Sequence, residues 1–168
     1  MKEKDILYLK ENVFKIIGKD NALLTAGTIQ DFNAMTIGWA TMGVLWGKNV
    51  VIVYVRPTRH TYNLMESHDI FTVSFYDEAF REKLSYLGTH SGKDEDKVKN
   101  CELTPMEVKD GGVTFGESRL TFVCKKIYFQ DLNPEEIPEF VIGKYYSRKD
   151  FHRFYIGEVV LLLEKEKI

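Results

Sequence analysis

The sequence has few cysteines and no long apolar run. Only Cys101 and Cys124 are cysteines among its 168 residues, and neither has a neighbour at the spacing of zinc or redox sites. We therefore expect two buried thiols in a reducing, cytoplasmic environment. The longest apolar run, Val50–Val55, has six residues, whereas a membrane-spanning helix needs about 20. The apolar stretch Ile6–Leu9 is also shorter than the roughly 7–15 residues of a signal peptide core. The sequence thus predicts no membrane partner.

The chain also has no excess of positive charge. Lys and Arg total 23 against 25 Asp and Glu, a net charge of −2, whereas a general nucleic-acid binder shows a clear basic excess. The four histidines are scattered along the chain, which argues against a bound metal. The glycine patterns of dinucleotide sites and P-loops are missing, and so is the G-x-S-x-G pattern of serine hydrolases. We expect no nucleic acid, no metal and no serine nucleophile.

Aromatic residues, in contrast, are abundant. The chain has 2 Trp, 9 Tyr and 11 Phe, a composition typical of sheets. Apolar patterns predict strands at residues 22–28, 50–55, 70–76, 118–130 and 152–163, and an extended segment at 35–42 that is broken by Gly38 and Gly43. They predict helices at 6–17, at 59–67 and at a third segment that ends at Gly88. Asp31–Asn33 is expected to break the chain between strands, and Asn133–Lys149 to be a connection. This order favours one mainly β (α+β) domain over residues 1–168, a barrel with short inserted helices.

The segment from Arg56 to Thr61 is the most informative local feature. Arg56, Arg59 and His60 crowd the predicted start of a helix, where the helix dipole already places about half a positive charge. Thr58 is expected to cap this helix. A bound phosphate would fit, because free helix amides, the hydroxyls of Thr58 and Thr61 and the arginine side chains can all bind one anion. The alternative is that nearby Asp or Glu side chains neutralise the arginines.

Three further segments are candidates for a binding site. Residues 33–39 leave backbone amides and carbonyls accessible beside Trp39, which suits a flat heteroaromatic ring; a bulged strand with a core tryptophan explains the same pattern. Residues 89–97 could fold over a phosphate or form an ordinary charged loop. His152 stands at the start of the last strand, where a lone histidine is more often a surface or half-buried residue.

Together these segments resemble the flavin reductase-like family of FMN-binding split-barrel proteins, which includes flavoredoxins and ferric reductases. The similarity runs from about Ala22 to Gly157. It is strongest in four segments that follow the family's order, NAMTIGWATMGVLWGK (33–48), VYVRPTRHTY (53–62), LSYLGTHSGKDEDKV (84–98) and FHRFYIGE (151–158). The resemblance implies a split β-barrel that forms a homodimer with FMN at the subunit interface.

The resemblance also assigns roles to individual residues. Those expected at the isoalloxazine ring are Asn33, Ala34, Met35 and Thr36, with Trp39 packed nearby. Those expected at the phosphate and ribityl chain are Arg56, Thr58, Arg59 and Thr61. Ser91 and Lys97 resemble the family's glycine-containing loop near the cofactor, and His152 matches a position near the flavin or the nicotinamide, where it is the candidate catalytic residue.

Two functions follow from the resemblance. The first is an NAD(P)H-dependent flavin reductase, in which FMN takes a hydride from NADH or NADPH and passes electrons to a free flavin, ferric iron or a protein. The flavin carries that chemistry and the protein supplies placement, which agrees with the lack of a side-chain dyad. The second is a non-catalytic FMN-binding electron carrier, or a flavin- or haem-binding module of the same barrel.

Overall fold

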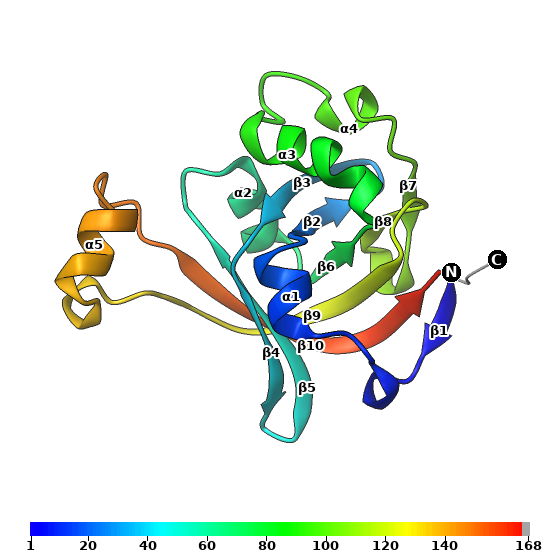
Figure 1. Cartoon of the computed structure of the whole chain (residues 1–168), viewed down its shortest axis with the longest axis horizontal. Helices are drawn as coiled ribbons and strands as arrows, with labels where there is room; N and C mark the ends of the chain where they lie inside the picture. Colours follow the sequence, from blue (N-terminus) through cyan, green and yellow to red (C-terminus); the bar gives the residue numbers. More distant parts are fainter. Residues whose placement is uncertain (166–168) are drawn as a thin grey trace.

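A computed structural model describes residues 1–165, and β-strands dominate it (Figure 1). The strands of this part, in chain order, are β1 (Lys2–Lys4), β2 (Ala22–Thr28), β3 (Asp31–Ile37), β4 (Ala40–Leu45), β5 (Lys48–Val55), β6 (Ile70–Phe75), β7 (Pro105–Glu107), β8 (Val113–Phe115), β9 (Leu120–Asp131) and β10 (Arg153–Glu164). The prediction of a mainly β chain with short helices is confirmed.

The helices are short and lie between the strands. The α-helices are α1 (Val13–Gly18), α2 (His60–Ser67), α3 (Arg81–Thr89), α4 (Lys97–Asn100) and α5 (Glu139–Tyr145). Short 3-10 turns are found at Ile6–Tyr8, Glu78–Phe80, Lys109–Gly111 and Pro134–Glu136. Among the residues described, no helix has the length and apolarity that crossing a membrane requires.

Within residues 1–165, eight strands form one antiparallel sheet in the order β3-β2-β6-β9-β10-β5-β4, with β1 paired to β10. The strands β7 and β8 make a separate hairpin. The two ends of this order, β3 and β4, are consecutive in the chain and are joined only by Gly38 and Trp39. The sheet therefore curls back on itself until its first and last strands meet at this corner, as in an open barrel (Figure 1).

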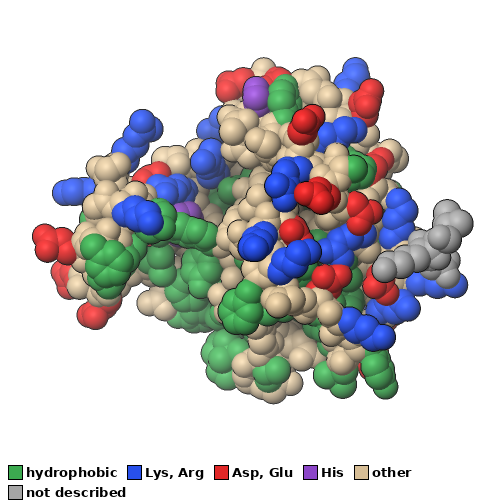
Figure 2. Space-filling model, in the orientation of Figure 1, with side chains coloured by type: hydrophobic (Ala, Val, Ile, Leu, Met, Phe, Trp, Pro, Cys, Tyr) green, Lys and Arg blue, Asp and Glu red, His purple; other side chains and the backbone are tan. Residues whose placement is uncertain are grey.

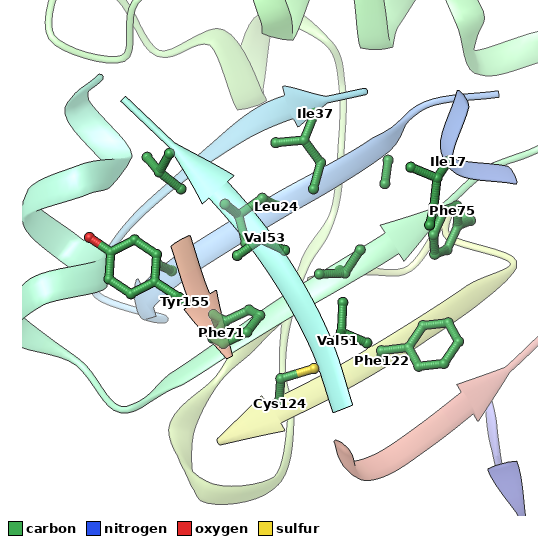
Figure 3. Packing of buried hydrophobic residues seen from close by; sticks show 14 of the residues in the cluster. Ile17, Leu24, Ile37, Val51, Val53, Phe71, Phe75, Phe122, Cys124 and Tyr155 are labelled. Atoms are coloured by element: carbon green, nitrogen blue, oxygen red, sulfur yellow. The ribbon is translucent and has the colours of Figure 1, made fainter. Parts of the chain in front are cut away.

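The interior of the curled sheet is filled by apolar side chains (Figure 3). They come from β2, β5, β6, β9 and β10 and include Leu24, Val51, Val53, Phe71, Phe75, Phe122, Cys124 and Tyr155. The register between β9 and β10 shifts at Gly157, where an added Cβ would lie 2.4 Å from Cζ of Phe71. Glycine at this position lets the Phe71 ring pack against the backbone at the bulge.

A second apolar cluster lies on the outer face of β2 and β3, under α3. Leu23 and Ala34 face it from the strands, and Leu84 and Leu87 face it from α3. The next residue on β2, Leu24, points into the barrel instead, because successive side chains of a strand face opposite ways. Strand β2 is therefore covered on both faces, and α3 is fixed against β3.

The predicted helix over residues 6–17 is wrong in its first half. A 3-10 turn occupies Ile6–Tyr8, and α1 begins only at Val13. The side-chain oxygen of Asn12 accepts from the amides of Phe14 and Lys15, both at 3.1 Å. This capping residue begins a new helix inside the predicted one, which apolar spacing alone does not register.

The predicted break at Asp31–Asn33 is also wrong. The turn lies at residues 29–30, and Asp31 already pairs with Thr28 as the first residue of β3. The extended segment predicted over 35–42 is broken at Gly38 as expected, because the chain turns a corner at Gly38 and Trp39, whereas Gly43 lies within β4.

Two further expectations need correction. Thr58 makes no capping hydrogen bond, since Arg59 occupies the N-cap position of α2 and its side chain does not cap either. The predicted connection Asn133–Lys149 contains α5, which stands away from the barrel at the left of Figure 1. None of the residues of α5 is buried, so its sequence has no buried apolar face that would reveal a helix.

Candidate functional site

A cavity of about 210 Å³ opens where β3, β5 and β10 come together. Six of the twelve residues predicted for the site line it, namely Met35, Thr36, Trp39, Arg56, Arg59 and His152; the other lining residues are Ile37, Gly38 and Tyr54. The chain topology explains the convergence. The end of β5 pairs with the beginning of β10, so that Val55 lies opposite Arg153, and the corner after β3 closes the third side.

Arg56 is held by an acidic partner from the segment between β9 and β10, residues 132–152, which carries α5 and is called the arm below. Its Nη1 donates to Oδ1 of Asp150 at 2.5 Å, and its Nη2 donates to the backbone carbonyl of Tyr145 at 2.9 Å. Its guanidinium also lies 5.2 Å from the centre of the Tyr146 ring. The hydrogen bond from Arg56 holds the pKa of Asp150 below its usual range. For Arg56, then, a carboxylate does neutralise the charge, as the alternative interpretation expected.

Arg59 is the cation of this site that stays free. It is exposed, and its side chain has no hydrogen bond or ion pair to any residue of the described range 1–165. It stands at the N-cap of α2, and in the same range no group accepts from the backbone amides of His60 and Thr61. A guanidinium beside unpaired amides at a helix N-terminus is a site that favours an anion.

Asn33 joins β3 to α2 by a buried hydrogen bond. Its Nδ2 donates to Oγ1 of the fully buried Thr61 at 2.7 Å. Gly92 lies against the other side of the same amide, because a Cβ added there would be 2.2 Å from Oδ1 of Asn33. The loop after α3 can approach this closely only with glycine at position 92. The Asn33 side chain is thus a link between β3, α2 and that loop.

Lys97 and Ser91 hold the same loop from within. The Nζ of Lys97 is buried and donates to the carbonyls of Leu87 at 2.8 Å and His90 at 3.1 Å, which caps the end of α3. Burial, followed by the positive charge of Arg59, lowers the pKa of Lys97 to about 8. Oγ of Ser91 accepts from the amide of Lys93 at 3.2 Å. Both side chains thus bond to the backbone of the loop and of the end of α3, and they fix the conformation of the loop.

His152 lies almost fully buried on the opposite wall of the cavity. Its Nδ1 is 2.8 Å from the hydroxyl of Tyr146, and its ring centre is 5.0 Å from that of Trp39. Burial, followed by the positive charge of Arg56, lowers the pKa of His152 to about 4. The imidazole is therefore neutral near pH 7. Trp39 also contacts Tyr145 of α5 edge to face at 5.2 Å.

The remaining predicted residues lie beside the cavity. Asn33 and Lys97 line a neighbouring hollow of about 450 Å³ between the β2–β3 turn and the loop after α3. The Ala34 side chain is buried under α3. Thr36, which lines the cavity itself, is held by its hydroxyl, which donates to the carbonyl of Leu84 at 2.5 Å. Thr58, Thr61 and Ser91 line neither space.

The sequence prediction did not include several residues that the structure places at the site. Tyr54 lines the cavity directly. Asp150 and Tyr146 reach it from the arm, as partners of Arg56 and His152. The only signal of the last two is the dense run of aromatic and charged residues KYYSRKDFH at 144–152, which does not by itself indicate a contact with residue 56.

Solved structures show which class of fold this is. The chain aligns with flavoredoxin from Methanosarcina acetivorans at 21% identity and a TM-score of 0.68, over 88% of this chain and 69% of that one. It aligns with an FMN-binding protein from Thermus thermophilus at 17% identity and a TM-score of 0.71, over 99% of this chain and 83% of that one. It aligns with an NADH:FAD oxidoreductase from Streptomyces globisporus C-1027 at 14% identity and a TM-score of 0.66, over 87% of this chain and 75% of that one. At these identities the likeness is one of fold, and it confirms the predicted split barrel.

The sequence itself then gives the family. Residues 15–167 match the model of the flavin reductase like domain, and the chain belongs to this family of flavin-related oxidoreductases. A comparison with curated proteins gives no match. The family match covers every residue of the cavity described above.

Proposed function

We propose that this chain binds FMN at the cavity and works as an NAD(P)H-dependent flavin reductase. In this proposal the phosphate lies at Arg59 and the start of α2, and the ring lies against Met35, Trp39 and His152. NADH or NADPH is the electron donor, and a free flavin, ferric iron or a protein is the acceptor. The family supports a flavin-related oxidoreductase, and relatives of the same fold are named as an FMN-binding protein and an NADH:FAD oxidoreductase.

The free charge of Arg59 is the observation that carries the proposal. An exposed guanidinium beside unpaired helix amides suits a phosphate, and the neighbouring cavity wall of Trp39, Met35 and Tyr54 suits a flat ring. Riboflavin would use only the second half of such a site and FMN would use both. The residues present therefore fit a phosphorylated flavin.

The size of the cavity supports a homodimer. Its 210 Å³ is below the roughly 300–1,000 Å³ of pockets that enclose a ligand of this class. Beside it, Figure 2 shows hydrophobic side chains gathered between α5 and the β4–β5 hairpin. Exposed large apolar residues of these elements, of the corner between β3 and β4 and of the same face of β9 are Trp39, Val44, Trp46, Tyr128, Phe140 and Tyr145. A patch of this kind marks an interaction surface, and a second copy seated there would enlarge the cavity.

The chain's own contribution is placement. FMN, when bound, supplies the hydride and electron transfer chemistry. Arg59 and the α2 amides would bind the phosphate of FMN. The hydrogen bond between Asn33 and Thr61 fixes α2 against β3. Arg56, a residue of the cavity wall, fixes the arm to the barrel through Asp150. The neutral imidazole of His152 adds no charge to the ring end of the cavity.

Anaerobic reduction tests the activity. The purified protein is loaded with FMN and mixed with NADH or NADPH in the absence of oxygen, and the flavin absorbance is followed. Rapid bleaching supports the reductase. Bleaching only after addition of a protein reductase would favour the electron carrier, and a Soret band in the purified protein would indicate haem binding instead.

Sedimentation tests the homodimer. The proposal expects a species at twice the chain mass of 19.5 kDa, and Trp46→Glu in the apolar patch should shift it toward the monomer. A wild-type monomer that binds FMN tightly would rule the dimer out.

A further inference from the structure

The two ring nitrogens of His152 have different environments. Nδ1 faces the buried hydroxyl of Tyr146 at 2.8 Å. Nε2 has no hydrogen-bond partner among residues 1–165. The buried side-chain polar atoms of this range that lack a partner are Thr25 Oγ1, His60 Nδ1 and Tyr76 Oη, so Nε2 of His152 is not fully buried. Nε2 is therefore the accessible nitrogen of a ring that lines the cavity.

The hydroxyl of Tyr146 decides which nitrogen carries the proton. If Nδ1 were protonated and donated to the tyrosine oxygen, the buried hydroxyl proton would have no protein acceptor, since Nδ1 is its only hydrogen-bond partner in the described chain. If the hydroxyl donates to a bare Nδ1, both groups are satisfied. The second arrangement is favoured, because an unpaired buried donor is costly.

Burial, together with the charged groups around the ring, keeps His152 neutral. Arg56 and Arg59 both disfavour a second positive charge at His152, and Asp150, which would favour it, is already bound by Arg56. The other faces of the ring meet the aromatic side chains of Trp39 and Tyr146. A burial-dominated environment of this kind lowers the pKa of the ring to about 4.

We propose that Tyr146 is a positioning residue that fixes His152 in the Nε2–H tautomer, so that the cavity contains an uncharged N–H donor. The group that it would meet is an acceptor on the edge of a heteroaromatic ring, a carbonyl oxygen or an unprotonated nitrogen. That this acceptor is the isoalloxazine of FMN rests on the proposed function. The assignment of the tautomer rests only on the contact between Tyr146 and His152.

Nuclear magnetic resonance of the flavin-free protein tests the tautomer. In ¹⁵N-labelled protein at pH 7, long-range correlations between ring protons and nitrogens distinguish Nε2–H from Nδ1–H, and the loss of one set of signals in His152→Gln assigns the residue. The wild type should show Nε2–H alone, and Tyr146→Phe should show a mixture of tautomers. Tyr145→Phe removes a hydroxyl one residue away that has no hydrogen bond to His152, and it should leave the spectrum unchanged.

Two results would overturn the proposal, namely Nδ1–H in the wild type or a Tyr146→Phe spectrum identical to the wild type. If Tyr146→Phe does not fold, the wild-type Nδ1 chemical shift decides, because a nitrogen that accepts a hydrogen bond resonates upfield of one that does not.

Flavin titrations separate this proposal from the proposed function. Tyr146→Phe should weaken FMN and riboflavin by the same factor, about two- to tenfold, since only the ring end changes; selective weakening of FMN would contradict a ring contact. If the wild type binds neither flavin, the proposed function fails while the tautomer result stands.

Discussion

Arg56 and Arg59 are separated by three positions, and only Arg56 has a carboxylate partner. Asp150 accepts from Arg56 at 2.5 Å, while Arg59 has no acidic partner among residues 1–165. The two arginines therefore have different tasks. Arg56 fixes the arm that carries α5, and Arg59 is available to an anion.

Arg59→Ala should weaken FMN binding and spare riboflavin. The substitution removes one charge-assisted hydrogen bond, a loss of about 1.5–3 kcal/mol, which corresponds to roughly a ten- to hundredfold higher dissociation constant. Riboflavin has the same ring without the phosphate, so its affinity should barely change. Fluorescence titration of both flavins measures the contrast.

Two control variants sharpen this test. Arg81→Ala removes an exposed arginine of α3 that lies 3.6 Å from Glu78, and both affinities should stay at the wild-type level. Arg56→Ala releases Asp150 and the arm, so FMN and riboflavin should weaken together. Equal weakening of the two flavins by Arg59→Ala would mean that this arginine is structural too.

Gly92→Ala should disturb the site without a change of charge. The new Cβ would lie 2.2 Å from Oδ1 of Asn33, so the loop must move away or the Asn33–Thr61 bond must break. We expect a loss of about 1–3 kcal/mol of unfolding free energy and weaker binding of both flavins, measured by urea denaturation and titration. Gly18→Ala is the matched control, because a Cβ there meets no atom within 4 Å. A Gly92→Ala protein as stable as Gly18→Ala would refute the close approach.

Acid should destabilise the protein partly through His152. Burial lowers its folded pKa to about 4, below the ordinary value of about 6.5, so between these values the unfolded chain binds a proton that the folded chain does not. The unfolding free energy should therefore fall as pH drops from 6.5 to 4, by up to about 3 kcal/mol from this group. His152→Gln removes this contribution and should show a shallower fall. Parallel stability curves for the two proteins in urea would count against it.

FMN binding near pH 8 should draw protons from the buffer. Burial and the charge of Arg59 lower the pKa of Lys97 to about 8, and a phosphate at Arg59 would offset that charge and raise it again. Uptake of up to about half a proton per site follows at pH 8, where the phosphate itself is already fully ionised, its second pKa being about 6. Calorimetry in two buffers of different ionisation enthalpy measures it. Riboflavin should give no uptake, and neither should FMN with Lys97→Met.

Both cysteines should be dispensable for flavin reduction. Cys124 is fully buried in the barrel and Cys101 is buried under α3; burial raises the pKa of both thiols. Cys124→Ala should cost about 1 kcal/mol of stability as a small core truncation, with FMN content and reduction rate unchanged. Loss of reduction at normal FMN content in the double Ala variant would contradict this.

Strands with a clear apolar pattern could be predicted from the sequence. The runs at 22–28 and 70–76 give β2 and β6 within one residue, because both faces of these strands are buried and most of their residues are β-branched or apolar. The run at 50–55 gives β5, whose two faces are unequally covered. Ile52 and Tyr54 are only half-buried on the outer side, next to the apolar patch that we assign to the homodimer contact.

The site could be predicted in its segments but not in its pairings. The run from Arg56 to Thr61 predicted the start of a helix, and α2 begins at His60. No local pattern could say which arginine is free, because the partner of Arg56 is 94 positions away. The same holds for His152, whose neighbour Tyr146 lies on an arm that the sequence describes only as a connection. Contacts across the fold, rather than propensities, divide these residues into structural and available groups.

The arm provides a reporter of its own. Among the described residues, the side-chain contacts that join α5 and Tyr146 to the barrel run through Arg56, Trp39 and His152, and all three of these line the cavity. Detachment of the arm therefore takes the cavity wall apart, and a molecule held in the cavity must oppose detachment. Deuterium uptake at the amides of α5 should slow in proportion to occupancy, whether or not the occupant absorbs light. Colourless compounds that compete for this cavity can thus be ranked by mass spectrometry of a single helix.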